Sequence, residues 1–136
     1  EIHERLVGSE MCIRDSGYSC SESLIKAALE EGLCPAELMP VATAFSGGMS
    51  SGCLCGAVAA AQIISGYKFG RENSQSNEVC ARENAAKIVE EFKKRNKITC
   101  CRVLSGGLEG SAKKERCSKY VSDACEILED LLKSKV

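Results

Sequence analysis

The sequence predicts a small all-α bundle of about five helices. From Gly17 onward, apolar residues recur at three- and four-residue intervals, whereas the alternating pattern of strands is nearly absent. Clusters of glycine, serine and proline separate these segments, as is typical of helix ends and short loops. The chain has 136 residues, of which 44% are hydrophobic, and this is enough for a single core.

Residues 1–16 do not share this pattern, so the predicted cysteine-rich helical domain spans residues 17–136. The stretch LVGSEMCIRDS resembles translated adaptor sequence, and we interpret residues 1–16 as a non-native N-terminal tail. Charged residues interrupt its apolar runs, which argues against a signal peptide. The single histidine, His3, and Cys12 both fall in this tail. The predicted domain therefore lacks the histidine that Cys-His catalysis or HExxH zinc binding needs.

The first helix is predicted over residues 19–31. Ser19 is followed three residues later by Glu22, which is the pattern of a capping box. Gly32 stands where a left-handed residue commonly ends a helix. The apolar stripe includes Cys20, so we expect this cysteine to point inward from the first turn.

Two further helices are predicted before the middle of the chain. One covers residues 35–45, which begin with a proline, and Pro40 is expected to bend it. Residues 46–52 (SGGMSSG) are predicted as a loop. The next helix covers residues 53–65 and ends at Gly66; it is apolar on nearly every face, which predicts a central, buried helix.

The second half contains two long predicted helices, over residues 76–94 and 111–133, with a short helix over residues 101–104 between them. The core face predicted for the first long helix consists of Val79, Ala85, Ala86, Ile88, Val89 and Phe92. The stripe predicted for the last helix consists of Cys117, Val121, Ala124, Cys125, Leu128, Leu131 and Leu132.

Cysteine is the unusual feature of the composition, with ten in the chain and nine in the predicted domain. No pair has CxxC spacing, so the thioredoxin motif and the zinc knuckle are both missing. Cys53 and Cys55 lie at a loop-to-helix junction, and Cys20 and Cys101 occupy comparable first-turn positions. Because the N-terminus of a helix favours a thiolate, three helix starts could combine their sulfurs at one end of a bundle. Arg102 either lowers the pKa of its neighbouring thiol further or is simply a surface arginine.

The remaining cysteines have simpler interpretations. Cys34, Cys80 and Cys125 lack a partner at ligand spacing, and we expect them to fill the core or lie on the surface. Adjacent Cys100 and Cys101 are not expected to pair with each other, because a vicinal disulfide is strained. One of the two is expected to face the site.

The order of these residues resembles the C-GCAxxG-C-C family of redox-active cysteine proteins. The matching elements, over about residues 18–128, are Cys20, residues 45–48 (FSGG), residues 55–57 (CGA), residues 101–104 (CRVL) and Cys117. The glycine and cysteine of the central motif stand here in the reverse order, and its closing glycine falls at Ala60.

The resemblance implies a small protein of a kind found mainly in anaerobic bacteria and archaea, with four signature cysteines. Carried over position by position, these are Cys20, Cys55, Cys101 and Cys117, as redox-active thiols or as ligands of a cluster or metal. Cys53 and Cys100 are the alternative ligands. The choice of Cys101 rests on the Arg-Val-Leu that follows it.

Three functions remain open for this four-cysteine centre. The first is thiol/disulfide exchange or electron transfer, which leaves open whether the protein is an oxidoreductase-type enzyme. The second is an electron-transfer or sensing module that holds an iron–sulfur cluster, as in the split-Soret-type cytochromes whose domains the family resembles. The third is a non-enzymatic domain with structural zinc, which we rank below the cluster.

Charge and hydropathy limit the partners. The net charge of −1 and the absence of Trp argue against nucleic acid, because such binding needs basic surplus and stacking aromatics. The longest apolar run, residues 53–64, has about 12 residues, whereas a membrane span needs about 20. We therefore expect a cytoplasmic protein without membrane insertion that works with a redox partner protein, and the sequence leaves its oligomeric state open.

Overall fold

The computed structural model of the chain describes residues 17–134. The predicted tail, residues 1–16, lies outside the described residues, and so do His3 and Cys12. Within the described range the chain forms α-helices and no strand, which confirms the predicted fold class. The helices are α2 (Cys20–Glu30), α3 (Leu38–Thr43), α4 (Gly56–Phe69), α5 (Val79–Asn96), α6 (Cys101–Ser105) and α7 (Gly110–Ser134).

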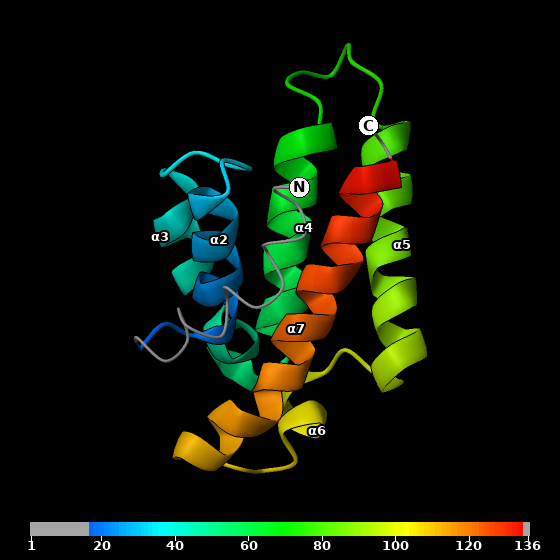
Figure 1. The fold of residues 1–136 in the computed structure, drawn as a ribbon. Helices are drawn as coiled ribbons and strands as arrows, with labels where there is room; N and C mark the ends of the chain where they lie inside the picture. The colour runs from blue at the N-terminus through cyan, green and yellow to red at the C-terminus, as the bar shows by residue number, and fades with distance from the viewer. Residues whose placement is uncertain (1–16, 135–136) are drawn as a thin grey trace.

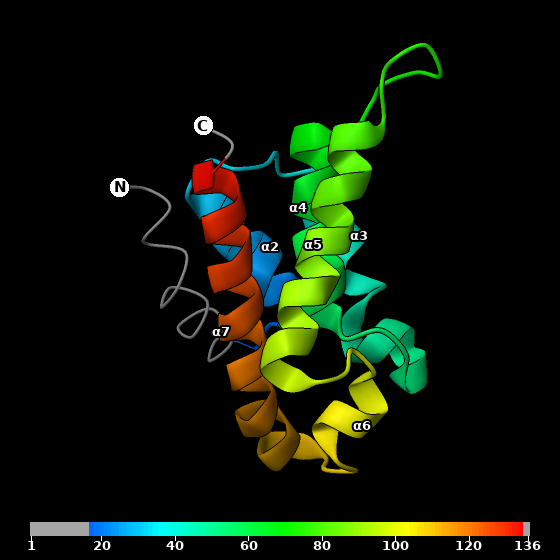
Figure 2. The same cartoon turned by 90° about the vertical axis from the view of Figure 1, so that its right-hand side faces the viewer.

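The long helices α2, α4, α5 and α7 run side by side, and the short helix α6 lies across one end of them (Figures 1 and 2). Helix α4 contacts α2, α5 and α7, so it occupies the centre of the bundle. Its buried residues are Gly56, Ala57, Val58, Ala59, Ala60, Ala61, Ile64 and Ser65. The prediction of a central, buried helix is confirmed, although this helix begins at Gly56 and continues through Gly66 to Phe69.

Helix α2 begins as the sequence predicts. The backbone N–H of Glu22 donates to the Ser19 hydroxyl at 3.3 Å, and the backbone N–H of Ser19 donates to the Glu22 carboxylate at 3.0 Å. This reciprocal pair is the capping box, and it fixes where the helix starts. At the other end, Gly32 adopts the expected left-handed conformation with φ of +75°. The position of Cys20, the first residue of α2, follows from this cap.

Two expectations from the sequence are wrong in detail. The helix expected over residues 35–45 shortens to α3, because Pro35 belongs to a turn in which its carbonyl accepts from the N–H of Leu38 at 3.2 Å. Pro40 then falls in the first turn of α3. The N–H groups of a first turn have no partner within the helix, so a proline is tolerated there.

The core face predicted for α5 is wrong in part, because the buried residues of this helix are Asn84, Ile88 and Phe92. Val79 is 53% exposed because it is the first residue of the helix, and Ala86 is also exposed. The stripe predicted for α7 is confirmed, because all its members from Val121 to Leu132 are buried.

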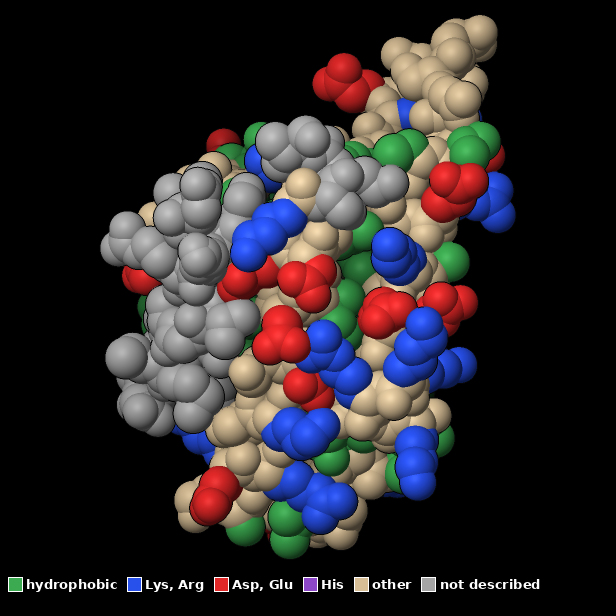
Figure 3. Space-filling model, turned by 45° about the vertical axis from the view of Figure 1, so that its right-hand side comes forward, with side chains coloured by type: hydrophobic (Ala, Val, Ile, Leu, Met, Phe, Trp, Pro, Cys, Tyr) green, Lys and Arg blue, Asp and Glu red, His purple; other side chains and the backbone are tan. Residues whose placement is uncertain are grey.

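Charged side chains alternate in sign over the surface of α5 and α7 (Figure 3). Lys94 pairs with Glu91 along α5 at 3.0 Å, whereas Arg95 reaches across to Glu126 of α7 at 2.8 Å. No helix within the described residues is both long and apolar enough to cross a lipid bilayer.

Candidate functional site

Three cysteines stand at the starts of three helices, as the sequence predicts. Cys20 is the first residue of α2, Cys55 caps the N-terminus of α4, and Cys101 is the first residue of α6. The bundle brings these helix starts together at the end where α6 crosses it (Figure 1). The fourth cysteine, Cys117, lies at the same end on α7 and is half-buried.

Backbone hydrogen bonds join the segment before α4 to the segment before α6. The N–H of Cys55 donates to the carbonyl of Thr99 at 2.7 Å, and the N–H of Cys101 donates to the carbonyl of Cys53 at 2.5 Å. This short antiparallel bridge explains why α4 does not begin at Cys53, because it holds Cys53 outside the helix in a non-helical conformation. It also places Cys55 and Cys101 close together although they are far apart in the sequence.

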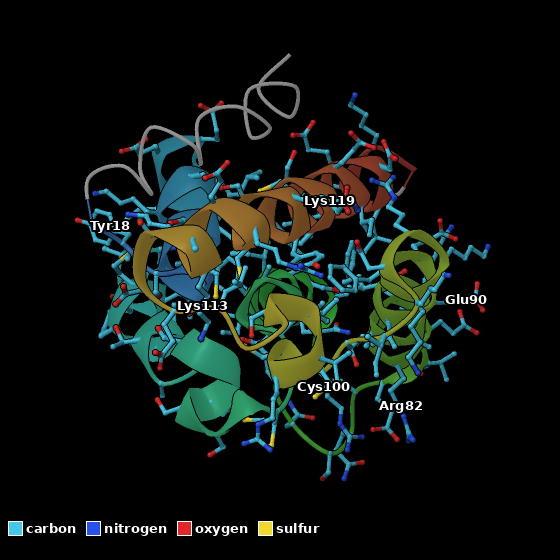
Figure 4. All side chains as sticks on the ribbon, turned by 90° about the horizontal axis from the view of Figure 1, so that it is seen from below. Tyr18, Arg82, Glu90, Cys100, Lys113 and Lys119 are labelled. Atoms are coloured by element: carbon cyan, nitrogen blue, oxygen red, sulfur yellow. The ribbon has the colours of Figure 1, made fainter. Side chains whose placement is uncertain are left out.

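The same bridge distinguishes Cys100 from Cys101. Leu54 and Cys100 are directly opposed in the bridge. Cys100 is extended, whereas Cys101 is already the first residue of α6 and is buried. The sulfur of Cys100 contacts the carbonyl of Gly52 at 3.3 Å. Figure 4 looks onto this end of the bundle and shows Cys100 on the opposite side of α6 from Lys113.

Two glycines make room for the cysteines. A Cβ at Gly56 would lie 2.5 Å from the Cys20 sulfur, so only glycine allows this sulfur to approach α4 so closely. A Cβ at Gly48 would lie 2.6 Å from the Cβ of Cys101. Gly48 also has a φ of +64°, which favours glycine independently of the space.

A cavity of about 350 Å³ opens between α2, α6 and the start of α7. Three of the four cysteines line it, and the full lining consists of Gly17, Tyr18, Ser19, Cys20, Glu22, Gly47, Cys101, Gly110, Lys113, Lys114 and Cys117. Cys55 is 6% exposed and is not part of the lining. A charge on Cys20 or on Cys101 raises the pKa of Cys55, which places all three within electrostatic reach of one another.

Burial favours the protonated form of Cys55 and Cys101. It raises the pKa of Cys55 to about 12, although the N–H groups of Val58 and Ala57 at the start of α4 act in the opposite direction. The pKa of Cys101 is also raised by burial, which outweighs the nearby charges of Lys113 and Arg102. The helix start at Cys55 and Arg102 beside Cys101 thus act in the expected direction, but burial outweighs both and the net pKa of each thiol is raised.

The other cysteines of the described chain lie outside this cavity. Cys34 is buried, with its sulfur 4.0 Å from the carbonyl of Ile25, and Cys125 is buried in the core. Cys80 is exposed on α5, and Cys53 is exposed beside the turn Gly48–Gly52.

The family model described as "Putative redox-active protein (C_GCAxxG_C_C)" matches residues 18–131. The chain belongs to this family. The resemblance in the sequence is thereby confirmed, and with it membership of a group described as redox-active. No curated protein and no solved structure matches the chain.

A four-thiol set of this family is chemically suited to an iron–sulfur cluster or to zinc. The side chains are not arranged as ligands, however: in the part of the chain that the structure describes, no three histidine, cysteine, aspartate or glutamate side chains form a group that could hold a metal ion. Cys20, Cys101 and Cys117 share one cavity without forming such a ligand group.

Lys113 and Lys114, which line the cysteine cavity, were not identified from the sequence. Lys113 lies four residues before Cys117 on α7, so both occupy the same face of that helix. That spacing is a signal visible in the sequence. The sequence predicts only a loop at Gly48, because its close approach to Cys101 depends on how distant segments fold together.

Proposed function

We propose that this protein carries out thiol/disulfide exchange through a centre made of Cys20, Cys55, Cys101 and Cys117. The observation that carries the proposal is the cavity between α2, α6 and α7, which Cys20, Cys101 and Cys117 line together. Cys55 does not line the cavity, but charge on Cys20 or on Cys101 raises its pKa, so it belongs to the same group of thiols. Four separate segments of the chain thus contribute thiols to one end of the bundle.

In this reaction two thiols are oxidised to one disulfide, and two electrons and two protons pass to an acceptor disulfide. We assign the attacking thiol to Cys101, because it lines the cavity and because Lys113 opposes the rise in its pKa that burial causes. Cys20 is the resolving thiol, since it lines the same cavity and is electrostatically coupled to Cys101. A cytoplasmic location, where thiols are kept reduced, suits such a centre.

A second candidate function is binding of an iron–sulfur cluster by the same four sulfurs. The raised pKa values of Cys55 and Cys101 support it, because a bound cation would compensate the cost of burying adjacent thiolates. Structural zinc is the third candidate on the same grounds. Both require the sulfurs to move into a ligand geometry that the described side chains do not adopt.

Anaerobic purification followed by an absorption spectrum, metal analysis and thiol counting tests these functions. Thiol/disulfide exchange predicts a colourless, metal-free protein that loses two thiols on mild oxidation and regains them on reduction. A brown protein with stoichiometric iron would contradict this proposal and support the iron–sulfur cluster. A colourless protein with stoichiometric zinc would contradict it and support the structural zinc site.

A further inference from the structure

A second, more open cavity of about 570 Å³ adjoins the cysteine cavity. The two share Gly47, Cys101 and Lys113 among their lining residues, so Cys101 is accessible from both. The charged and hydroxyl side chains of the second cavity come from the turn before α4, from α6 and from α7: Ser46, Ser50, Ser51, Arg102, Ser105 and Lys113. Its lining contains two cations and no carboxylate.

Arg102 is held in position at this cavity. Its guanidinium donates to the carbonyl of Ser51 at 3.0 Å, and its side chain packs over Gly52, where an added Cβ would lie 3.0 Å from Nε. Because a guanidinium carries five N–H donors, this one contact leaves others for a ligand. Within the described residues neither Arg102 nor Lys113 forms an ion pair with a carboxylate, whereas Arg95 and Lys119 on the α5–α7 surface do.

The size of the cavity favours a small molecule. Small-molecule sites typically measure about 300–1,000 Å³, and this cavity falls within that range. Two unpaired cations on a carboxylate-free wall attract an anion such as a carboxylate, sulfonate or phosphate. We propose that the cavity binds the anionic group of a small disulfide substrate and presents its S–S bond to Cys101. This inference rests on the proposed thiol/disulfide exchange and names its substrate class.

The reaction is balanced by the protein's own thiols. The Cys101 thiolate attacks one sulfur of the substrate, so that a mixed disulfide forms and the first substrate thiolate leaves. Cys20 then attacks the Cys101 sulfur, a Cys20–Cys101 disulfide forms, and the second substrate thiolate leaves. The substrate gains two electrons, the protein loses two, and the protons of Cys20 and Cys101 end on the two released thiols or in solvent.

The test compares two aryl disulfides of similar reactivity, dianionic dithiobis(nitrobenzoate) and neutral dithiodipyridine. Both are reacted with reduced protein in which Cys12, Cys53 and Cys80 are replaced by Ser, so that thiols outside the proposed centre contribute less. The quantity of interest is the ratio of the two rate constants, anionic over neutral. Loss of Lys113 also changes the pKa of Cys101, but this slows both probes alike and cancels in the ratio.

Replacing both cations, as Arg102→Gln with Lys113→Gln, should lower this ratio about tenfold, because two positive charges no longer attract the anionic probe. Lys113→Gln alone should lower it about threefold and avoids disturbing the turn that Arg102 holds. The matched control removes two cations from α5, as Arg82→Gln with Lys87→Gln, and should leave the ratio unchanged. Neither control residue lines either cavity.

An unchanged ratio in both the double variant and Lys113→Gln would overturn the anion site. The proposed exchange is judged separately, by whether the neutral probe releases two thiols per chain and leaves an internal disulfide. Saturable binding of inorganic sulfate, followed by NMR shifts of the Gly52 amide, supplies a readout that needs no thiol. Sulfate binding that is lost in the double variant supports the site, and binding that persists there contradicts it.

Discussion

The sulfur of Cys20 lies directly against Gly56, the first residue of α4, so that a Cβ at this glycine would stand only 2.5 Å from it. The same Cβ would stand 2.9 Å from the carbonyl oxygen of Phe45. Gly56 immediately follows Cys55, and the close approach therefore brings the first turn of α2 to the helix start that carries the second thiol. The contact depends on a residue without a side chain.

Gly56→Ala should therefore destabilise the protein by about 1–3 kcal/mol, because the added methyl group overpacks a buried contact with a sulfur and a backbone carbonyl. The matched control is Gly66→Ala in the same helix, where an added Cβ meets nothing within 4 Å. That change should stabilise the protein by about 0.5–1 kcal/mol, since alanine is the better helix former. Urea unfolding of the reduced variants measures both values, and equal effects of the two changes would contradict the packing described at Cys20.

Stability should fall at alkaline pH because of Cys55. Its pKa is raised to about 12 in the folded protein, above the value of about 8.5 expected for an unfolded chain. The folded state then holds the proton more tightly, so this stabilisation is complete below the unfolded pKa and is lost as pH rises toward the folded one. The slope for one proton is about 1.4 kcal/mol per pH unit.

Unfolding free energies of wild type and Cys55→Ser, compared between about pH 8 and 11 with a phosphine reductant, isolate this contribution. Wild type should lose more stability than Cys55→Ser over that range. Cys80→Ser, which changes an exposed cysteine, should follow the wild-type curve. Parallel curves for wild type and Cys55→Ser would mean that Cys55 is not buried as described.

The carbonyl of Leu104 ties α6 to α7 and so positions Cys101. It accepts from the Tyr120 hydroxyl at 2.9 Å and from Nε of Arg116 at 2.8 Å. Tyr120→Phe should cost about 0.5–1.5 kcal/mol through the lost hydrogen bond. It should also speed alkylation of Cys101, because α6 is less firmly held over the cavity. Peptide-resolved alkylation with iodoacetamide measures the second effect, and an unchanged rate at Cys101 would argue against this role of Tyr120.

Much of the fold was predictable because its determinants are local. The capping pair Ser19 and Glu22 fixes the start of α2 within four residues, and the apolar stripe of α7 marks its buried face from Val121 onward. The helix-start position of Cys20 follows from this capping pair.

The remaining features depend on contacts between distant segments. A backbone bridge between Cys100 and Leu54 fixes the segment before α6, and no local pattern near Cys100 reveals it. The pKa of Cys55 could not be predicted from its position at a helix start, because α4 is surrounded by three other helices and burial outweighs the helix N-terminus. The shortening of α3 likewise reflects a turn at Pro35.

Substitution of single cysteines should separate the proposed centre from the rest. Replacing Cys20 or Cys101 by Ala should abolish the reversible loss of two thiols, because the attacking or the resolving sulfur is missing. Cys80→Ser and Cys125→Ala should retain this loss, even where removing a core sulfur lowers stability by about 1 kcal/mol or more. Thiol titration of the denatured protein before and after oxidation counts the thiols that are lost. If Cys20→Ala and Cys101→Ala still lose two thiols reversibly, neither cysteine belongs to the centre.

Disulfide mapping tests most directly whether the four cysteines form one centre. Reduced, folded protein is oxidised with one equivalent of dithiodipyridine at low protein concentration, residual thiols are alkylated, and the linked peptides are identified by mass spectrometry. We expect links only among Cys20, Cys55, Cys101 and Cys117, with Cys20–Cys101 predominant. Links that join Cys34, Cys80 or Cys125, or the absence of any internal disulfide, would contradict it.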